Sequence, residues 1–95
     1  MSQRRVVIGV ATGLHARPAA ELARLAQGVP GGLRIRVGAD VVDASSVLAV
    51  MDLALSAGDP VVLEADGPGA GAALDAAEAL LAPARTTKDT HDLPL

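Results

Sequence analysis

Several short stretches of this chain show the apolar pattern of β-strands. A period of two places successive side chains on opposite faces of an extended backbone, so each stretch predicts a strand. The predicted strands are residues 4–10, 33–37, 41–43 and 60–65. In the second of them Leu33, Ile35 and Val37 are expected to face the core, while Arg34 and Arg36 are expected to face solvent.

Between these strands apolar residues recur every three or four positions, which predicts helices. One helix covers residues 16–27, where Pro18 fits the first turn and Gly28 ends the helix. A short second helix follows Ser45 or Ser46, either of which can cap it. A third, rich in alanine, covers residues 70–82. The order strand, helix, strand, strand, helix, strand, helix indicates an α+β domain with helices on one sheet face and arginines on the other.

The domain is expected to end at residue 83. Pro83 cannot continue the third helix, and residues 84–95 lose the apolar period. We therefore expect residues 1–83 to form one domain and residues 84–95 to form a disordered tail. His91 lies in that tail with no arginine or helix terminus close to it in sequence, and is expected to be a solvated side chain.

Composition restricts the core and several classes of function. The 95 residues include no Phe, Tyr, Trp or Cys, so the core must be aliphatic and no thiolate metal site can form. The lack of aromatic platforms for bases, together with a net charge of −3, argues against nucleic-acid binding. Two histidines far apart in sequence do not make a zinc site, so we expect neither a metal nor a cofactor.

The chain shows no pattern of a membrane span or a secretion signal. No apolar run approaches the roughly 20 residues that span a bilayer. The N-terminal apolar run is interrupted by Gly9, which fits a strand better than the core of a signal peptide. We therefore expect a soluble cytoplasmic protein that does not bind membranes.

The most distinctive pattern is Gly-Leu-His-Ala-Arg-Pro-Ala-Ala at residues 13–20. It places His15 and Arg17 at the start of a helix, where a positive charge opposes the helix dipole by roughly 0.3–1 kcal/mol. Free N–H groups at such a terminus attract anions, and Arg17 adds a forked donor suited to phosphate oxygens. The same field is expected to lower the pKa of His15 and leave a neutral nitrogen as a nucleophile. The pattern indicates phosphoryl transfer onto His15.

Two other interpretations of His15 are open at this point. A histidine before a helix is in most sequences a solvated or capping residue rather than a nucleophile. Alternatively, His15 could act as the general base of a small hydrolytic enzyme, although the motif offers no convincing nucleophile or carboxylate partner beside it.

Residues 13–20 resemble the active-site motif of the HPr family, the histidine-containing phosphocarriers of the bacterial sugar phosphotransferase system. A second stretch, residues 45–53, resembles the short second helix of that family, with Ser46 at the place of its regulatory serine. The order and spacing of the predicted elements also agree. The resemblance implies an open-faced β-sandwich, in which three helices cover one face of a four-stranded antiparallel sheet.

The resemblance also implies a function. His15 would accept a phosphoryl group on Nδ1 from enzyme I, which is charged by phosphoenolpyruvate, and would pass it to a sugar-specific enzyme IIA during sugar uptake. Arg17 would neutralise the phosphate charge, and the backbone N–H groups of Ala16 and Arg17 would hold its oxygens. Such a protein is a covalent carrier and not an enzyme with a turnover of its own.

The partners implied by the resemblance are enzyme I, enzyme IIA domains and, through Ser46, HPr kinase/phosphorylase and transcriptional regulators. The docking surface would consist of Thr12, Ala20, Arg24, Val47, Leu48 and Met51. This surface is mainly apolar, so charge steering should contribute less to docking. Relay through one exposed face favours a monomer.

Two departures from the family pattern concern the loop and the second helix. Thr12 stands where many relatives carry Asn or Ser, and keeps a hydroxyl. Ser45 stands where kinase-regulated members often have a basic residue, which leaves phosphorylation of Ser46 open. A regulatory or nitrogen-related paralogue, acting by protein binding rather than in sugar transport, would carry the same motif.

Overall fold

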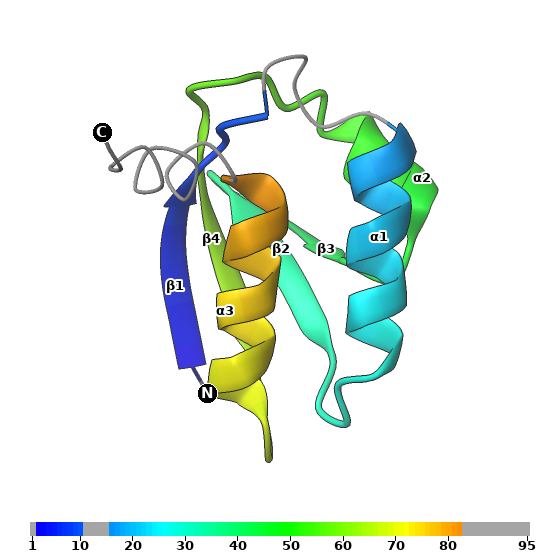
Figure 1. Cartoon of the computed structure of the whole chain (residues 1–95). Helices are drawn as coiled ribbons and strands as arrows, with labels where there is room; N and C mark the ends of the chain where they lie inside the picture. The colour runs from blue at the N-terminus through cyan, green and yellow to red at the C-terminus, as the bar shows by residue number, and fades with distance from the viewer. Residues whose placement is uncertain (1, 11–15, 83–95) are drawn as a thin grey trace, which may run out of the picture.

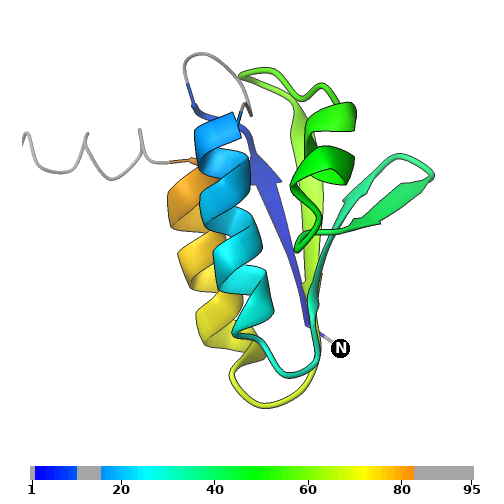
Figure 2. The ribbon, with the colours of Figure 1, turned by 90° about the vertical axis from the view of Figure 1, so that its right-hand side faces the viewer.

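The computed structural model describes residues 2–10 and 16–82, which form a β-sheet with helices packed against it (Figure 1). The elements are β1 (Ser2–Val7), α1 (Ala16–Gln27), β2 (Leu33–Val37), β3 (Asp40–Asp43), α2 (Val47–Asp52), β4 (Pro60–Ala65) and α3 (Ala70–Leu81). The strand order is β1-β4-β2-β3, and every neighbouring pair is antiparallel. Figure 2 shows α1 and α3 side by side along the sheet, and α2 packs against α1 and β3. The expected open α+β architecture is confirmed.

The first strand lies nearer the N-terminus than the apolar alternation predicts. β1 ends at Val7 and not at residue 10, because Val7 lies opposite Pro60, where the partner strand β4 begins. The N–H of Gly9 instead donates to the carbonyl of Leu81 at 2.7 Å, which holds this part of the chain against the end of α3. The other strands and the two long helices agree with their predicted bounds to within one residue.

The core is aliphatic and lies between the sheet and the helices. Its almost fully buried large side chains are Val6, Ile8, Leu22, Leu33, Ile35, Val50, Val61, Leu63, Leu74 and Leu81. Both long helices also bury alanines, and Ala19 and Ala77 have no exposed surface. Small side chains at these positions let the helices approach each other and the sheet closely. The predicted inward residues of β2 are confirmed for Leu33 and Ile35, whereas Val37 is only half-buried.

The uncovered face of the sheet carries a charge cluster that the apolar pattern does not predict. Its centre is Glu64 of β4, whose side chain is almost fully buried. The Nε of Arg36 donates to Glu64 Oε2 at 2.8 Å, and Gln3 Nε2 donates to the same oxygen at 3.1 Å. Arg34 Nε lies 3.6 Å from Oε1 of this carboxylate. Arg34 and Arg36 are therefore half-buried around a carboxylate, which corrects the expectation that they simply face solvent.

Ala54 adopts a backbone conformation that is costly for its side chain. It follows Leu53, the C-terminal cap of α2, and has a φ of 52°, the left-handed region that favours glycine. Its N–H donates to the carbonyl of Met51 at 3.0 Å, which ends the helix. A Cβ in this conformation costs roughly 1–2 kcal/mol, and the position after a helix cap is usually glycine for that reason. Ala54 is thus a point of local strain.

Replacing Ala54 with glycine is expected to stabilise the protein, because glycine adopts positive φ without a steric cost. We expect the free energy of unfolding, measured by urea denaturation, to rise by roughly 0.5–1 kcal/mol. The matched control is Ala79→Gly at an exposed position of α3, which should lower it by a similar amount. A loss of stability in both variants would contradict the strain at Ala54.

The cluster around Glu64 predicts a loss of stability in acid. The hydrogen bond from Arg36, supported by Gln3 and Arg34 and opposed by burial, lowers the pKa of Glu64 in the folded protein. A carboxyl with a lowered folded-state pKa stabilises the fold above its unfolded-state pKa, and this contribution disappears as the pH falls through the folded-state pKa.

Thermal unfolding between neutral pH and pH values below the ordinary carboxyl range measures this effect. Glu64→Gln should be less stable than the parent at neutral pH, because Arg34 and Arg36 lose their shared counter-charge, and its stability should depend less on acid. The control is Asp52→Asn, since Asp52 is exposed and forms no ion pair with any residue that the structure describes. An acid dependence in Glu64→Gln that equals that of the parent would rule out the cluster as its source.

Candidate functional site

The distinctive motif, residues 13–20, spans the N-terminus of α1. α1 begins at Ala16, the start that its sequence predicts. Pro18 is buried in the first turn, where its missing N–H costs no helical hydrogen bond. His15 and Thr12 lie outside the residues that the structure describes. The peptide bond between His15 and Ala16 nevertheless ties the histidine to this turn, so its role stays a prediction attached to a defined place in the fold.

Arg17 projects from the first turn of α1 into solvent. Its side chain is 85% exposed, and its Nε lies 3.9 Å from Oε2 of Glu21, at the far limit of an ion pair. Exposed pairs one helical turn apart contribute only about 0.3–0.5 kcal/mol, and no acidic residue lies in the first turn itself. The guanidinium can therefore reorient toward an anion beside the helix start, where free N–H groups carry a partial positive charge.

Ser46 is the N-terminal cap of α2. Its backbone is extended (φ −98°, ψ 104°), and its exposed hydroxyl oxygen accepts a hydrogen bond from the N–H of Ala49 at 3.3 Å. Ser45, the other candidate cap, instead donates through its N–H and its hydroxyl to Asp43 Oδ1, at 2.9 Å and 2.8 Å. These two bonds lower the pKa of the Asp43 carboxyl. The serine that resembles the regulatory residue of the family is thus the one that caps the helix.

Exposed apolar side chains gather on α2 beside α1. Leu48 is 76% and Met51 is 38% exposed, while Val47 is partly buried against the core. On α1, Ala20 and Arg24 are exposed. Because α1 and α2 pack against each other, these predicted docking residues belong to two adjoining helices (Figure 1). Large exposed apolar side chains on adjoining elements are typical of protein–protein contact surfaces.

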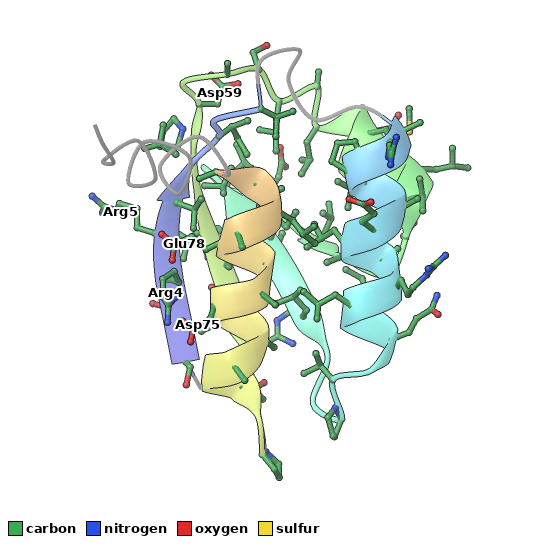
Figure 3. All side chains as sticks on the ribbon, viewed as in Figure 1. Arg4, Arg5, Asp59, Asp75 and Glu78 are labelled. Carbon is green, nitrogen blue, oxygen red and sulfur yellow. The ribbon has the colours of Figure 1, made fainter. Side chains whose placement is uncertain are left out.

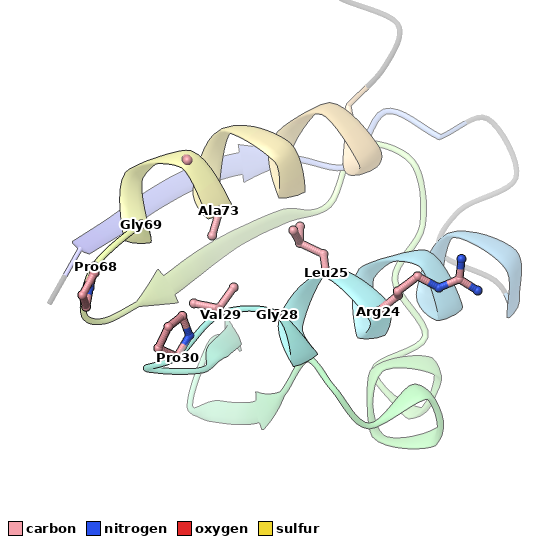
Figure 4. A pocket seen from close by; sticks show the side chains of 9 residues that line it. Arg24, Leu25, Gly28, Val29, Pro30, Pro68, Gly69 and Ala73 are labelled. Carbon is pink, nitrogen blue, oxygen red and sulfur yellow. The ribbon is translucent and has the colours of Figure 1, made fainter.

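A groove that the sequence does not predict lies between the end of α1 and the start of α3 (Figure 4). It measures about 390 Å³ and is lined by Arg24, Leu25, Gly28, Val29, Pro30, Pro68, Gly69, Ala72 and Ala73. Of these residues only Arg24 is a predicted functional residue, because the lining comes together only when the turns before β2 and α3 meet. The lining holds one charged side chain, which is exposed, and so lacks the convergent polar groups of a catalytic pocket.

Neither a metal-binding cluster nor a membrane-spanning helix occurs in the part of the chain that the structure describes. No three His, Cys, Asp or Glu side chains in that part are placed to hold a metal ion. No helix in it has the length and apolar character needed to cross a bilayer.

Comparison with known proteins identifies the family of the chain. Residues 2–83 match the family described as "PTS HPr component phosphorylation site". The chain is 44% identical over 84 residues to the phosphocarrier protein HPr of Streptomyces coelicolor. The aligned region covers 86% of this chain and 89% of that protein. It is 36% identical over 74 residues to a multiphosphoryl transfer protein of Xanthomonas campestris pv. campestris. This aligned region covers 78% of this chain and 9% of that longer protein.

The fold is shared with a solved structure of the same family. The crystal structure of a phosphocarrier protein HPr from Bacillus anthracis superposes with a TM-score of 0.78 at 31% identity, covering 84% of this chain and 95% of that chain. The family match contains both motifs, at residues 13–20 and 45–53. The chain therefore belongs to the HPr family, the phosphocarrier proteins of the phosphotransferase system.

Proposed function

We propose that His15 is the phosphoryl acceptor of this HPr-family phosphocarrier, charged by enzyme I and discharged to a sugar-specific enzyme IIA. The observation that carries the proposal is the start of α1 at Ala16, one residue after His15, with the exposed Arg17 as the charged side chain of the first turn. The family match over residues 2–83, described as a phosphorylation site, supports the same assignment.

The chemistry is the transfer of a phosphoryl group from enzyme I to His15, followed by its transfer from His15 to enzyme IIA. The lone pair of His15 Nδ1 forms a bond to phosphorus, and the bond between phosphorus and the donor atom of enzyme I breaks, with its electron pair staying on the donor. In the second transfer an acceptor atom of enzyme IIA bonds to phosphorus, and the bond between phosphorus and Nδ1 breaks with its electron pair returning to His15. Positioning and electrostatic stabilisation supply most of the catalysis in such transfers, so the carrier needs little machinery of its own.

The first turn of α1 supplies the stabilising groups. The backbone N–H groups of Ala16 and Arg17 have no partner within a helix and are free to hold phosphate oxygens. The guanidinium of Arg17 brings a full positive charge, and among the described residues it is held only by a long contact to Glu21. Because these groups are in place before the reaction, little reorganisation is needed when the phosphoryl group arrives.

The docking surface for enzyme I and enzyme IIA is formed by α1 and α2. Leu48 and Met51 are its exposed apolar contacts, and Val47 adds a half-buried one. Arg24 contributes the charge at its edge and forms no ion pair with the residues that the structure describes. Ala20 leaves room beside it for a partner. Thr12, outside the described residues, completes the predicted set.

Ser46 is the regulatory position of this surface. Its hydroxyl is exposed at the start of α2, between the docking residues and the turn from β3. A phosphate there would gain from the N–H groups of α2 and would place negative charge beside Val47 and Leu48. HPr kinase/phosphorylase and transcriptional regulators are the partners that this position would serve.

Incubation with phosphoenolpyruvate and purified enzyme I tests the acceptor. We expect one acid-labile phosphoryl group per chain, located on His15 by mass spectrometry, and none in His15→Ala. The free energy of unfolding of that variant should stay within about 0.5 kcal/mol of the parent, because His15 is predicted to lie at the surface and surface substitutions usually change stability by no more than that. The matched control, His91→Ala, should be phosphorylated like the parent.

Phosphorylation of His15→Ala, or its loss in His91→Ala, would contradict the assignment. Transfer from the phosphorylated chain to enzyme IIA then tests the pathway. A chain that accepts the group but passes it to no enzyme IIA would favour the regulatory or nitrogen-related alternative. Catalytic release of phosphate without any stable phosphoprotein would favour the hydrolytic one.

Substitution of Ser46 by aspartate separates regulation from capping. Aspartate also caps helices, so Ser46→Asp should keep the stability within tenths of a kcal/mol, whereas Ser46→Ala should lose roughly 0.5–2 kcal/mol. We expect slower phosphorylation of His15 in Ser46→Asp, through a raised KM for enzyme I at low salt. High salt should reduce the difference by screening the added charge. Identical kinetics of Ser46→Asp and the parent at both salt concentrations would leave Ser46 as a cap only.

A further inference from the structure

The uncovered face of the sheet divides into two rows of different chemistry. The strand register aligns Gln3, Glu64, Arg34 and Asp43 in one row across the four strands, and Arg5, Val62, Arg36 and Val41 in the next. Residues opposite each other in register point to the same face of the sheet. In the first row Glu64 accepts a hydrogen bond from Gln3 and lies close to Arg34, and it also accepts one from Arg36 of the second row. The second row, called here the Arg5–Val41 row, contains no acidic residue of its own.

The Arg5–Val41 row is apolar and open. Val41 is 43% exposed, and Val7, two residues from Arg5 on the same strand and the same face, is 53% exposed. These are two of the four large hydrophobic residues exposed in the part of the chain that the structure describes. A groove of about 390 Å³ runs along the row, lined by Arg5, Arg36, Gly38, Pro60, Val61 and Val62.

The row is also positively charged. Arg5 forms no ion pair with any described residue, and Figure 3 shows it extending away from the helices, whereas Arg4 points toward Asp75 and Glu78 of α3. Arg36 bonds Glu64 through Nε. A segment that combines acidic and apolar side chains would complement such a row in both charge and hydrophobicity.

The chain itself contains a segment of this composition. Residues 84–95 lie beyond the family match, which ends at residue 83. Residues 89–95 combine Asp89 and Asp92 with Leu93 and Leu95, whereas Arg85 and Lys88 precede them. The family match therefore does not explain the composition of residues 84–95. Within this stretch the aspartates and the leucines lie close together in sequence.

The distance from the end of α3 to the Arg5–Val41 row can be spanned by residues 83–88. Leu81 accepts the hydrogen bond from Gly9, two residues past Val7 on the edge strand β1, so the chain leaves α3 at the end of the sheet where Val7 is exposed. Six extended residues, 83–88, reach about 20 Å. The row begins at Arg5, about 13 Å from Gly9 along the extended chain. From there it crosses the sheet in steps of about 4.8 Å per strand. Residues 89–95 can therefore lie along it.

We propose that residues 89–95 dock on the Arg5–Val41 row of their own chain. The aspartates face Arg5 and Arg36, and the leucines cover Val7, Val62 and Val41. Tethering raises the effective concentration of such a segment to the order of mM, so even a weak contact is populated. Because the charges are exposed, the contact weakens with salt.

A spin label on the full-length chain tests this contact. The sequence contains no cysteine, so Thr90→Cys provides a single labelling site. We expect the amide NMR signals of Arg5, Val62 and Arg36 to broaden, while those of α1 and α2 stay sharp. Raising the salt concentration should restore the broadened signals.

Charge variants of the labelled chain provide the controls. Arg5→Gln should remove most of the broadening, as should the pair Asp89→Asn and Asp92→Asn. The matched changes Arg85→Gln and Lys88→Gln in the connection before the docking segment, and Arg24→Gln on α1, should leave it unchanged. Each variant removes charge and leaves the leucines and valines of the proposed contact unchanged.

Three results would overturn the proposal. Signals that stay sharp along the row mean that the segment does not dock there. Broadening centred on α1 or α2 places the segment on the docking surface for partners instead. Broadening that appears in an isotope-labelled chain mixed with a spin-labelled chain without isotope identifies a second copy as the occupant.

Discussion

An aliphatic core with no aromatic ring is the constraint on which the rest of the structure depends. Without bulky side chains to separate the layers, α1 and α3 pack closely on the sheet, and Ala19 and Ala77 are completely buried. Larger residues there would force the layers apart at a cost of typically 1–3 kcal/mol. The hydrogen bond from Gly9 to Leu81 adds a second tie at the end of the sheet where α1 begins. Close packing thus gives the first turn of α1 a fixed place at the edge of the domain.

The proposed chemistry needs little beyond that fixed turn. The helix start provides N–H groups, and Arg17 provides a charge that Glu21 barely restrains. In the proposed function, specificity depends on the apolar side chains of α2, above all Leu48, which is 76% exposed. Ser46 joins the two functions, because it caps α2 and stands at the border of the apolar surface. Under the proposed function, we expect a charge added there to act on docking while the fold stays intact.

The helices could be predicted from the sequence because their signals are local. Pro18 and the capping serine act within one turn of their own helix. Pro18 was placed correctly, and the structure selects Ser46 from the two predicted caps, Ser45 and Ser46. The end of β1 was predicted wrongly, because a partner strand that begins at Pro60 decides where the ladder stops. The buried charge cluster around Glu64 was not predicted for a similar reason. Only the pairing of the strands places Arg36 and the other partners around this carboxylate. The motif at residues 13–20 names the candidate site, and its chemistry stays a prediction.

The most direct test of the central claim is the response of the backbone amides to phosphorylation. Phosphoenolpyruvate and enzyme I would charge the isotope-labelled chain, and NMR would record the amide shifts before and after. We expect the largest downfield changes at Ala16 and Arg17, because their N–H groups bind the new phosphate oxygens. Changes centred elsewhere in the domain, with the first turn of α1 unaffected, would contradict the claim that this turn holds the phosphoryl group.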